Sequence, residues 1–311
     1  MPERTQETEA PLDLLPHSTL GIRACMPPAS LHVQRDTRRD WSEGQDPVFS
    51  LPPRVRTDGI SLIIPAWNEE KRLPTTLRQY VPLLEEMKVD FEVIVVVDGA
   101  TDGTVSAAEE FLTRGVRLLR YPKRLGKGGA ITEGVRAARH GSVGFVDADG
   151  PVTPESLLQL VCELGEHDGS IASRCKLQRR GAGLQSPPLH RRVLSRGWRL
   201  LTRVILGLRF SDTQCGAKFF RKEALHIALR RVTLMNWAFD ASLLLHFSKC
   251  GFSIKEIPVE WRYDSHSKLR IERVAPLMLM SLIGLRLANS ELVSGRAESW
   301  MVRFRSWVEL G

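Results

Sequence analysis

The stretch Phe91-Glu-Val-Ile-Val-Val-Val97 decides the fold class of this chain. It is a short, nearly continuous apolar run rich in β-branched residues, which is typical of a strand covered on both faces of its sheet. Two further buried strands are expected nearby, at residues 60–65 and 143–146. Strands of this kind are found in parallel sheets, so the sequence predicts an α/β protein.

Helical segments separate these strands. We expect helices at residues 74–87, 104–112, 129–139 and 154–164, the last with Thr153 as its N-cap. Further strands are expected at residues 116–120 and 170–173. Strands alternating with helices through short connections predict right-handed crossovers and a doubly wound, mostly parallel, Rossmann-like sheet.

The second half of the chain is less regular. We expect helices at residues 191–206, 239–248 and 271–287, and strands at residues 217–220, 254–258 and 259–263. Residues 1–58 are rich in Pro, Arg, Asp, Glu and Ser and predict a disordered leader, with an extended arm packed on the domain as the alternative. Residues 59–270 would form the α/β domain. Residues 271–311 would form C-terminal helices that either lie on a membrane surface or pack in the core.

Composition restricts the partners and the compartment. The formal net charge of +8 suggests anionic partners: nucleic acid, phosphorylated small molecules or an acidic membrane face. The five cysteines form no C-x-x-C pair, which predicts reduced thiols, a cytoplasmic location and no structural zinc. We expect no signal peptide. We also expect no membrane-spanning helix, because the longest apolar candidate, residues 275–287, contains Pro276 and Arg286.

Polar clusters follow three of the predicted strands. They are Ala66-Trp-Asn-Glu69, Asp98-Gly-Ala-Thr-Asp102 and Asp147-Ala-Asp149. Ligands of open parallel sheets bind beyond the carboxyl ends of the strands. If the three strands are parallel neighbours, the clusters face one crevice.

Asp147 and Asp149 are the most informative of these residues. Two carboxylates that leave a buried strand can hold Mg²⁺ or Mn²⁺, which prefer oxygen ligands and usually share them with a substrate diphosphate. The alternative is a simple turn, because Asp and Gly favour turns.

The loop after residue 97 does not form a calcium site. Ala100 occupies a position that an EF-hand needs for a ligand, and a strand rather than a helix precedes the loop. An acidic residue at a strand end, Asp98, is instead expected to contact a nucleoside.

The glycine-rich segment Leu125-Gly-Lys-Gly-Gly-Ala130 enters a predicted helix. It matches neither a Walker A motif nor G-x-G-x-x-G. A helix N-terminus with Lys127 nearby can attract phosphate, and the alternative is helix capping with close packing.

Arg174 ends a strand at the same sheet edge and is a candidate clamp for an anionic acceptor. Arg191, Arg192 and Arg196 are weaker candidates, because charged helix faces are usually only solvated. Asp240 opens an apolar helix, where a carboxylate also favours the helix dipole.

Taken together, these segments resemble the inverting family 2 glycosyltransferases of GT-A fold, and among them the dolichyl-phosphate β-glucosyltransferase branch. The resemblance covers residues 60–269. It rests on Ile64-Pro-Ala-Trp-Asn-Glu-Glu70, Val97-Asp-Gly-Ala-Thr-Asp-Gly-Thr104, Gly126-Lys-Gly-Gly-Ala130, Asp147-Ala-Asp-Gly150, Ser173-Arg174, Asp212-Thr-Gln-Cys-Gly216, Trp237-Ala-Phe-Asp240 and Ser265-His-Ser-Lys-Leu269. The segments at 212–216 and 237–240 are the ones specific to the dolichyl-phosphate sugar branch.

The resemblance implies a role for each matching residue. The residues bordering the donor nucleoside would be Pro65, Ala66, Glu69, Asp98 and Lys127. Asp147 and Asp149 would hold the metal and the diphosphate. The donor-sugar and acceptor-phosphate side would be lined by Arg174, Asp212 and Gln214. Trp237 and Asp240 would lie beside the sugar. Lys268 would lie on a loop that closes over the donor.

Two positions depart from the family pattern, and both bear on the nucleoside. Val97 stands where the family usually has the first of two Asp residues, and Ala100 stands where Ser is common. Relatives often carry an N-terminal membrane anchor, which we do not expect here.

The implied reaction is displacement at the anomeric carbon of a UDP-sugar, with UDP-glucose as the first candidate, by a polyprenyl phosphate. If the acceptor is a hydroxyl instead, Asp240 is our candidate base. Alternatives are transfer of mannose from GDP-mannose, transfer to a soluble or secondary-metabolite acceptor, or a non-catalytic protein that binds nucleotides or nucleic acid. We expect no nucleic-acid partner, since no recognised binding motif is found.

Overall fold

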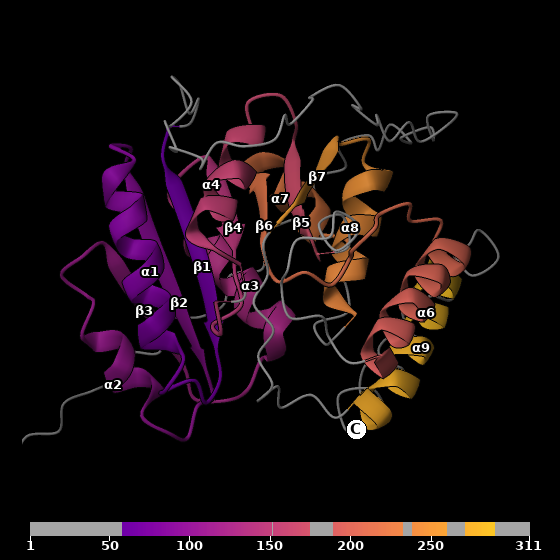
Figure 1. The fold of residues 1–311 in the computed structure, drawn as a ribbon, viewed down its shortest axis with the longest axis horizontal. Coiled ribbons are helices and arrows are strands. Elements are labelled where there is room, and N and C mark those ends of the chain that lie inside the picture. The colour runs from indigo at the N-terminus through magenta and orange to yellow at the C-terminus, as the bar shows by residue number, and fades with distance from the viewer. Residues whose placement is uncertain (1–57, 151, 175–188, 233–237, 260–270, 290–311) are drawn as a thin grey trace, which may run out of the picture.

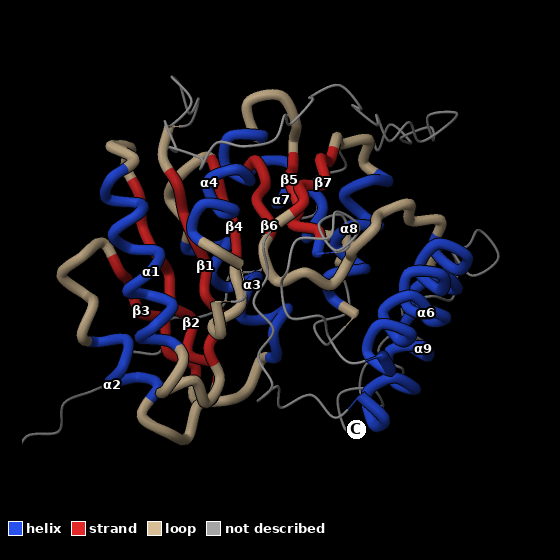
Figure 2. The backbone as a smooth tube through the Cα atoms, viewed as in Figure 1, coloured by secondary structure: helices blue, strands red, loops and turns tan. Residues whose placement is uncertain are grey.

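The computed structural model describes residues 58–150, 152–174, 189–232, 238–259 and 271–289. These residues build a seven-stranded sheet with helices on both of its faces (Figures 1 and 2). The strand order is β3-β2-β1-β4-β6-β5-β7. All strands run in one direction except β6, which is antiparallel to both of its neighbours. The predicted α/β class and the mostly parallel, doubly wound sheet are therefore confirmed.

The bounds of the elements agree with the predicted ones to within about three residues. The strands are β1 Ile60–Ala66, β2 Phe91–Asp98, β3 Val116–Tyr121, β4 Ser142–Phe145, β5 Gly169–Ser173, β6 Lys218–Arg221 and β7 Ile254–Pro258. The helices are α1 Leu73–Glu86, α2 Thr104–Glu109, α3 Gly126–Ala137, α4 Pro154–Glu163, α6 Leu189–Leu206, α7 Lys222–Leu229, α8 Phe239–Lys249 and α9 Ile271–Ala288.

Three local predictions have different outcomes. The hydroxyl of Thr153 accepts a hydrogen bond from the Ser156 N–H, so the predicted N-cap of α4 is confirmed. Helix α7 was not predicted, because its eight residues follow β6 without a turn signal. The strand expected at residues 259–263 falls almost wholly outside the described residues, as do the leader and the chain beyond residue 289.

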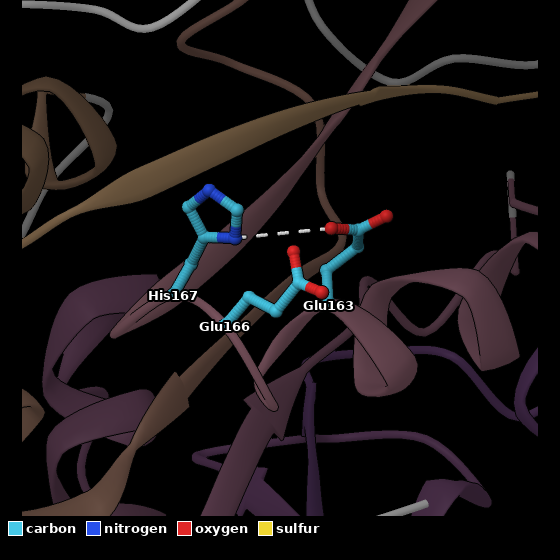
Figure 3. A group of neighbouring side chains, drawn as sticks. All are labelled: Glu163, Glu166 and His167. Atoms are coloured by element: carbon cyan, nitrogen blue, oxygen red, sulfur yellow. Dashed lines mark ion pairs between the residues drawn. The ribbon is translucent and has the colours of Figure 1, made fainter. Parts of the chain in front are cut away.

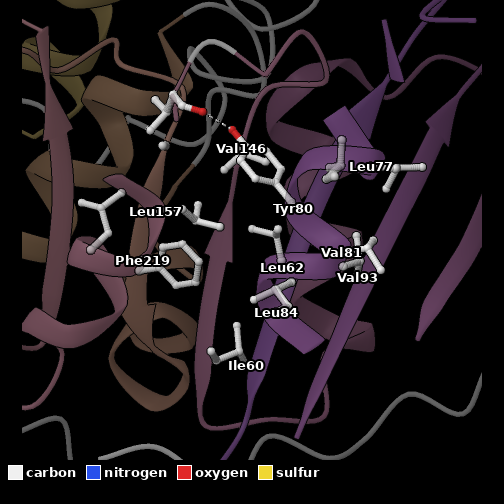
Figure 4. Close-up of a cluster of buried hydrophobic side chains, with 14 of the residues drawn as sticks. Ile60, Leu62, Leu77, Tyr80, Val81, Leu84, Val93, Val146, Leu157 and Phe219 are labelled. Carbon is white, nitrogen blue, oxygen red and sulfur yellow. Dashed lines mark hydrogen bonds between the residues drawn. The ribbon is translucent and has the colours of Figure 1, made fainter. Parts of the chain in front are cut away.

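The central strands alternate their side chains between two apolar layers. Val93, Val95 and Val97 join the layer under α1 and α4, whereas Ile94 and Val96 join the layer under α3, α7 and α8. Figure 4 shows the first layer. A strand buried on both faces needs no polar residue, which explains the continuous apolar run that identified β2.

Helices α6 and α9 pack side by side at one end of the molecule, beyond β7 (Figure 1). Among the described residues, none of the helices has the length and hydropathy needed to span a bilayer.

Candidate functional site

The carboxyl ends of β1, β2 and β4 meet at one edge of the sheet. β1 lies between the other two strands and is parallel to both. The loops after β1 and β2 are joined directly, because the Glu69 N–H donates to the Thr104 hydroxyl at 2.8 Å and the Thr101 N–H donates to Asn68 Oδ1 at 2.8 Å. The strand order therefore brings the three predicted polar clusters to one place.

Four alternating charges run from this edge into the core. Lys127 Nζ lies 2.9 Å from Asp147 Oδ1 and 3.1 Å from Asp240 Oδ2. The other oxygen of Asp240 lies 2.6 Å from Nζ of Lys218, which is fully buried. In the folded chain, Asp240 therefore lies between two lysines, Lys127 and Lys218.

The pKa values follow from this arrangement. Burial alone would raise the pKa of Asp240, but Lys127 and Lys218 outweigh burial and hold that pKa below its ordinary value. Burial likewise works to lower the pKa of Lys127, but Asp147 and Asp240 raise it above the ordinary value. Asp240 and Lys127 are therefore both charged at neutral pH.

Asp149 is surrounded by charges of both signs. Its Oδ2 lies 3.6 Å from Nη1 of Arg72, whose Nε in turn donates to Glu69 at 2.6 Å. Burial and then the charge of Asp147 raise the pKa of Asp149 to about 6, although Arg72 opposes the rise. A carboxylate disfavoured by burial and by a like charge gains much from a cation placed beside it.

Asp147 and Asp149 fit a divalent cation. They offer hard carboxylate oxygens, and the pKa of Asp149 is raised first by burial and then by the charge of Asp147, so a cation beside the pair would favour the ionised carboxylate. No group of three possible metal ligands among the described residues includes either of them. The other ligands would therefore be water and phosphate oxygens, which Mg²⁺ commonly keeps.

Helix α1 holds the turn that carries the two aspartates. The Thr76 hydroxyl donates to the Ala148 carbonyl at 2.7 Å, and the Tyr80 hydroxyl donates to the Val152 carbonyl at 2.6 Å. Both donors lie on the buried face of α1, and Figure 4 shows Tyr80 among the apolar side chains of this layer. The turn is thus fixed by side chains from a rigid element.

The end of the segment 212–216 packs against the Asp147 carboxylate. A Cβ atom added to Gly216 would lie 1.9 Å from Asp147 Oδ2 and 2.4 Å from its Cγ. Only glycine allows this approach of main chain to carboxylate.

Asp98 makes contacts other than the expected ones with a nucleoside. One of its oxygens accepts the Gly126 N–H at 2.9 Å, and the other accepts the Leu125 N–H. The side chain is almost completely buried. In this structure Asp98 holds the glycine-rich turn at the start of α3 and so sets the position of Lys127.

Arg174 and Asp212 form one unit. The Arg174 guanidinium donates to both oxygens of Asp212, at 2.6 and 2.9 Å. Burial would raise the pKa of Asp212, but Arg174 holds it below the ordinary value. Asp212 therefore orients Arg174, whose side chain is 30% exposed. The nearby Gln214 Nε2 is buried without a hydrogen-bond partner among the described residues.

Of the remaining candidate residues, some lie within the described part of the chain and others do not. Pro65 and Ala66 end β1, and the Ala66 side chain packs in the core. Arg196 is exposed on α6. Trp237 and Lys268 lie outside the described residues, as do the side chains of Arg191 and Arg192.

Three contributors to the site were missed by sequence reasoning. Arg72 follows Glu69 by three residues, a spacing that permits an ion pair on a helical turn. Lys218 interrupts an apolar strand, which was a usable signal of a buried partner. The Arg124 guanidinium lies 3.5 Å from the centre of the Trp67 ring, a stacking that only the folded chain brings about.

One cluster of possible metal ligands lies elsewhere (Figure 3). Glu163, Glu166 and His167 gather just before β5, hence at the opposite edge of the sheet from the two aspartates. His167 Nδ1 lies 3.8 Å from Glu163 Oε2. This cluster is separate from the site described above.

Comparison with known proteins shows the family to which the chain belongs. The model of the family described as Glycosyl transferase family 2 matches residues 61–227. A dolichyl-phosphate beta-glucosyltransferase of Trichomonas vaginalis is 31% identical over 267 residues, which are 80% of this chain and 77% of that protein. The enzyme of the same name from Drosophila melanogaster is 33% identical over 226 residues, covering 68% and 69%.

Solved structures are similar in fold. A glucosyl-3-phosphoglycerate synthase of Mycobacterium tuberculosis superposes with a TM-score of 0.54 at 23% identity, covering 74% of this chain and 80% of that one. A structure of the same enzyme with Mn²⁺, UDP and glucosyl-3-phosphoglycerate has a TM-score of 0.51 at 21% identity, covering 74% and 79%. At these identities the likeness establishes the GT-A-like fold.

The contact between Gly216 and Asp147 leads to the first prediction. Gly216→Ala should displace the Asp147 carboxylate, because the added Cβ overlaps its oxygen. We expect affinity for Mn²⁺, measured by electron paramagnetic resonance, to fall at least about tenfold, with little change in thermal stability. Gly141→Ala is the matched control, since nothing lies within 4 Å of its added Cβ. Unchanged Mn²⁺ affinity in Gly216→Ala would contradict the assignment of Asp147.

Proposed function

The chain belongs to glycosyl transferase family 2, and we propose that it transfers a hexose, with glucose from UDP-glucose as the first candidate, to a polyprenyl phosphate such as dolichyl phosphate. The names of its relatives support glucose as the sugar and dolichyl phosphate as the acceptor. Solved structures of similar fold contain UDP with Mn²⁺ or Mg²⁺, which supports a nucleotide donor and a divalent ion.

The observation that carries the proposal is the position of Lys127 beside the aspartate pair. Its ammonium lies 2.9 Å from Asp147, and it belongs to the first turn of α3. A carboxylate pair for a cation, a lysine and a helix N-terminus together suit a diphosphate. A divalent ion bound at Asp147 and Asp149 would offset the charge that grows on the departing diphosphate.

The surroundings of Asp240 favour an acceptor that is already anionic. Both of its oxygens are ion-paired, to Lys127 and to Lys218, and its pKa is held low. Such a carboxylate is a poor proton acceptor. A phosphate acceptor needs no base, whereas a sugar hydroxyl does. We therefore propose that Asp240 positions Lys127 and does not act as a base.

Arg174 would meet the acceptor phosphate. Asp212 holds two of its nitrogens in a fixed plane, so little side-chain entropy is lost when the guanidinium binds an anion. Positioning and charge screening would then provide most of the rate enhancement.

We further propose that α6 and α9 lie on a membrane surface that carries acidic lipids. Helix α6 contains arginine at five positions and no acidic residue. Val193, Leu200 and Val204 are 58%, 62% and 73% exposed on it. Helix α9 exposes Leu279, Met280, Ile283 and Leu287. Exposed apolar side chains between arginines are typical of helices that bind anionic lipid.

This face adjoins the proposed acceptor side of the site. The Trp198 Nε1–H on α6 donates to the Thr213 hydroxyl at 3.2 Å. Thr213 follows Asp212, which orients Arg174. A lipid phosphate held at the membrane would therefore reach the site from the side of α6.

The donor and the metal are tested together. Purified protein, polyprenyl phosphate and radiolabelled UDP-glucose should give label in the organic phase only when Mn²⁺ or Mg²⁺ is added. Asp149→Asn should lower turnover at least about a hundredfold, because it removes a metal-binding carboxylate. Glu163→Gln, in the cluster at the opposite sheet edge, is the control and should retain turnover.

Each other outcome of this assay has a definite meaning. Full turnover by Asp149→Asn would exclude the metal role. Transfer of label to an added soluble acceptor, with none to polyprenyl phosphate, would favour a soluble acceptor, and transfer from GDP-mannose instead of UDP-glucose would change the donor.

The membrane face is tested by placing negative charge on its exposed apolar positions. The double variant Leu200→Glu/Val204→Glu should bind vesicles of 70% phosphatidylcholine and 30% phosphatidylglycerol at least about tenfold more weakly in a sedimentation assay. Leu112→Glu/Ile227→Glu is the matched control, because both residues are 45% exposed on other helices or loops. Equal binding by the two double variants would refute this membrane face.

A further inference from the structure

Lys218 is a buried lysine at the far end of the charge chain. None of its side-chain surface is exposed. Its ammonium donates to Asp240 Oδ1 at 2.6 Å and to the Cys215 carbonyl at 2.6 Å, and it lies 5.5 Å from the centre of the Phe145 ring. A buried ammonium is costly unless it is paired and hydrogen-bonded, so these partners account for its retention in β6.

The first partner connects Lys218 with one oxygen of Asp147. Asp240 is shared between Lys218 and Lys127, and Lys127 is shared between Asp240 and Asp147. Without the charge of Lys218, Asp240 would draw Lys127 toward itself as its nearest counter-ion. Asp147 Oδ1 would then lose its partner.

The second partner connects Lys218 with the other oxygen of Asp147. The Cys215 carbonyl belongs to the planar peptide group that continues into Gly216. Holding this carbonyl therefore fixes the main chain that packs against Asp147 Oδ2. Both oxygens of Asp147 are thus positioned, by different routes, from one buried ammonium.

We infer that Lys218 is a positioning residue for Asp147, the carboxylate that the proposed function assigns to the metal and the donor diphosphate. It touches neither ligand and acts through Asp240 and through the Cys215–Gly216 peptide. This inference rests on the proposed function, and it adds a residue whose contribution is geometric.

A purely structural role is the competing explanation. Buried ion pairs can often be replaced by apolar side chains without loss of stability, so packing alone gives little reason for a lysine among apolar neighbours. The two explanations differ in what a neutral replacement does. A structural lysine would change unfolding only, whereas a positioning lysine would change Mn²⁺ affinity in protein that remains folded.

The test compares Lys218→Met with Lys222→Met. Lys222 also donates to a main-chain carbonyl, that of Ala138, at 2.6 Å, but it follows β6 at the opposite edge of the sheet from Asp147. Thermal unfolding gives stability. Electron paramagnetic resonance of Mn²⁺ without nucleotide, and calorimetry with UDP and Mn²⁺, give binding. We expect Lys218→Met to lose at least about tenfold in Mn²⁺ affinity and Lys222→Met to bind as wild type does.

The double variant Lys218→Met/Asp240→Asn covers the case in which Lys218→Met does not fold. It removes both charges of the buried pair and should fold. The Cys215 carbonyl still loses its donor, so the main chain at Gly216 is released and Mn²⁺ affinity should remain at least about tenfold below wild type. Wild-type Mn²⁺ affinity in either folded variant, or an equal loss in Lys222→Met, would overturn the inference. Failure of the wild-type protein to bind UDP and Mn²⁺ would instead refute the proposed function.

Discussion

The ammonium of Lys127, shared between Asp147 and Asp240, is the interaction on which the site depends. It joins a loop at the sheet edge to a helix on one face of the sheet by an ion pair with each carboxylate. Around it, the cations Arg72, Lys127 and Lys218 face the carboxylates of Glu69, Asp147, Asp149 and Asp240. One carboxylate charge is left without a balancing side chain in this set. A divalent ion beside Asp147 and Asp149, whose side chains are 33% and 34% exposed, would offset this excess of negative charge.

Much of the fold follows from the sequence, because its signals are local. The apolar run at residues 91–97 predicts a doubly covered strand, and the alternation of Val93, Val95 and Val97 with Ile94 and Val96 between two apolar layers accounts for it. The same strands predict where the polar clusters meet. The reversed direction of β6 was not predicted, since four residues of strand carry no signal of orientation. The strand partners of β6 lie 47 to 79 residues away along the chain and depend on tertiary structure.

The sequence indicates which side chains meet at this edge of the sheet more fully than it indicates the contacts they make there. Asp98 and Asp212 were assigned to ligands, yet their oxygens accept hydrogen bonds from the chain itself, at the glycine-rich turn and at Arg174. A sequence shows where a carboxylate lies along the chain but not which donors its oxygens accept hydrogen bonds from. Main-chain N–H groups and other side chains compete with ligands for those oxygens. The role of Lys218 was not predicted for a related reason. Its partners, Asp240 and the Cys215 carbonyl, come into contact with it only in the folded chain.

The central claim is that Asp147 and Asp149, brought together with Lys127, hold a cation and a nucleoside diphosphate at one edge of the sheet. Crystals grown with Mn²⁺ and UDP, measured for anomalous scattering of manganese, test this most directly. The account predicts one strong peak bound by both aspartates and by the diphosphate of UDP. A peak at Glu163, Glu166 and His167 with none at the aspartate pair, or UDP bound away from Lys127, would contradict it.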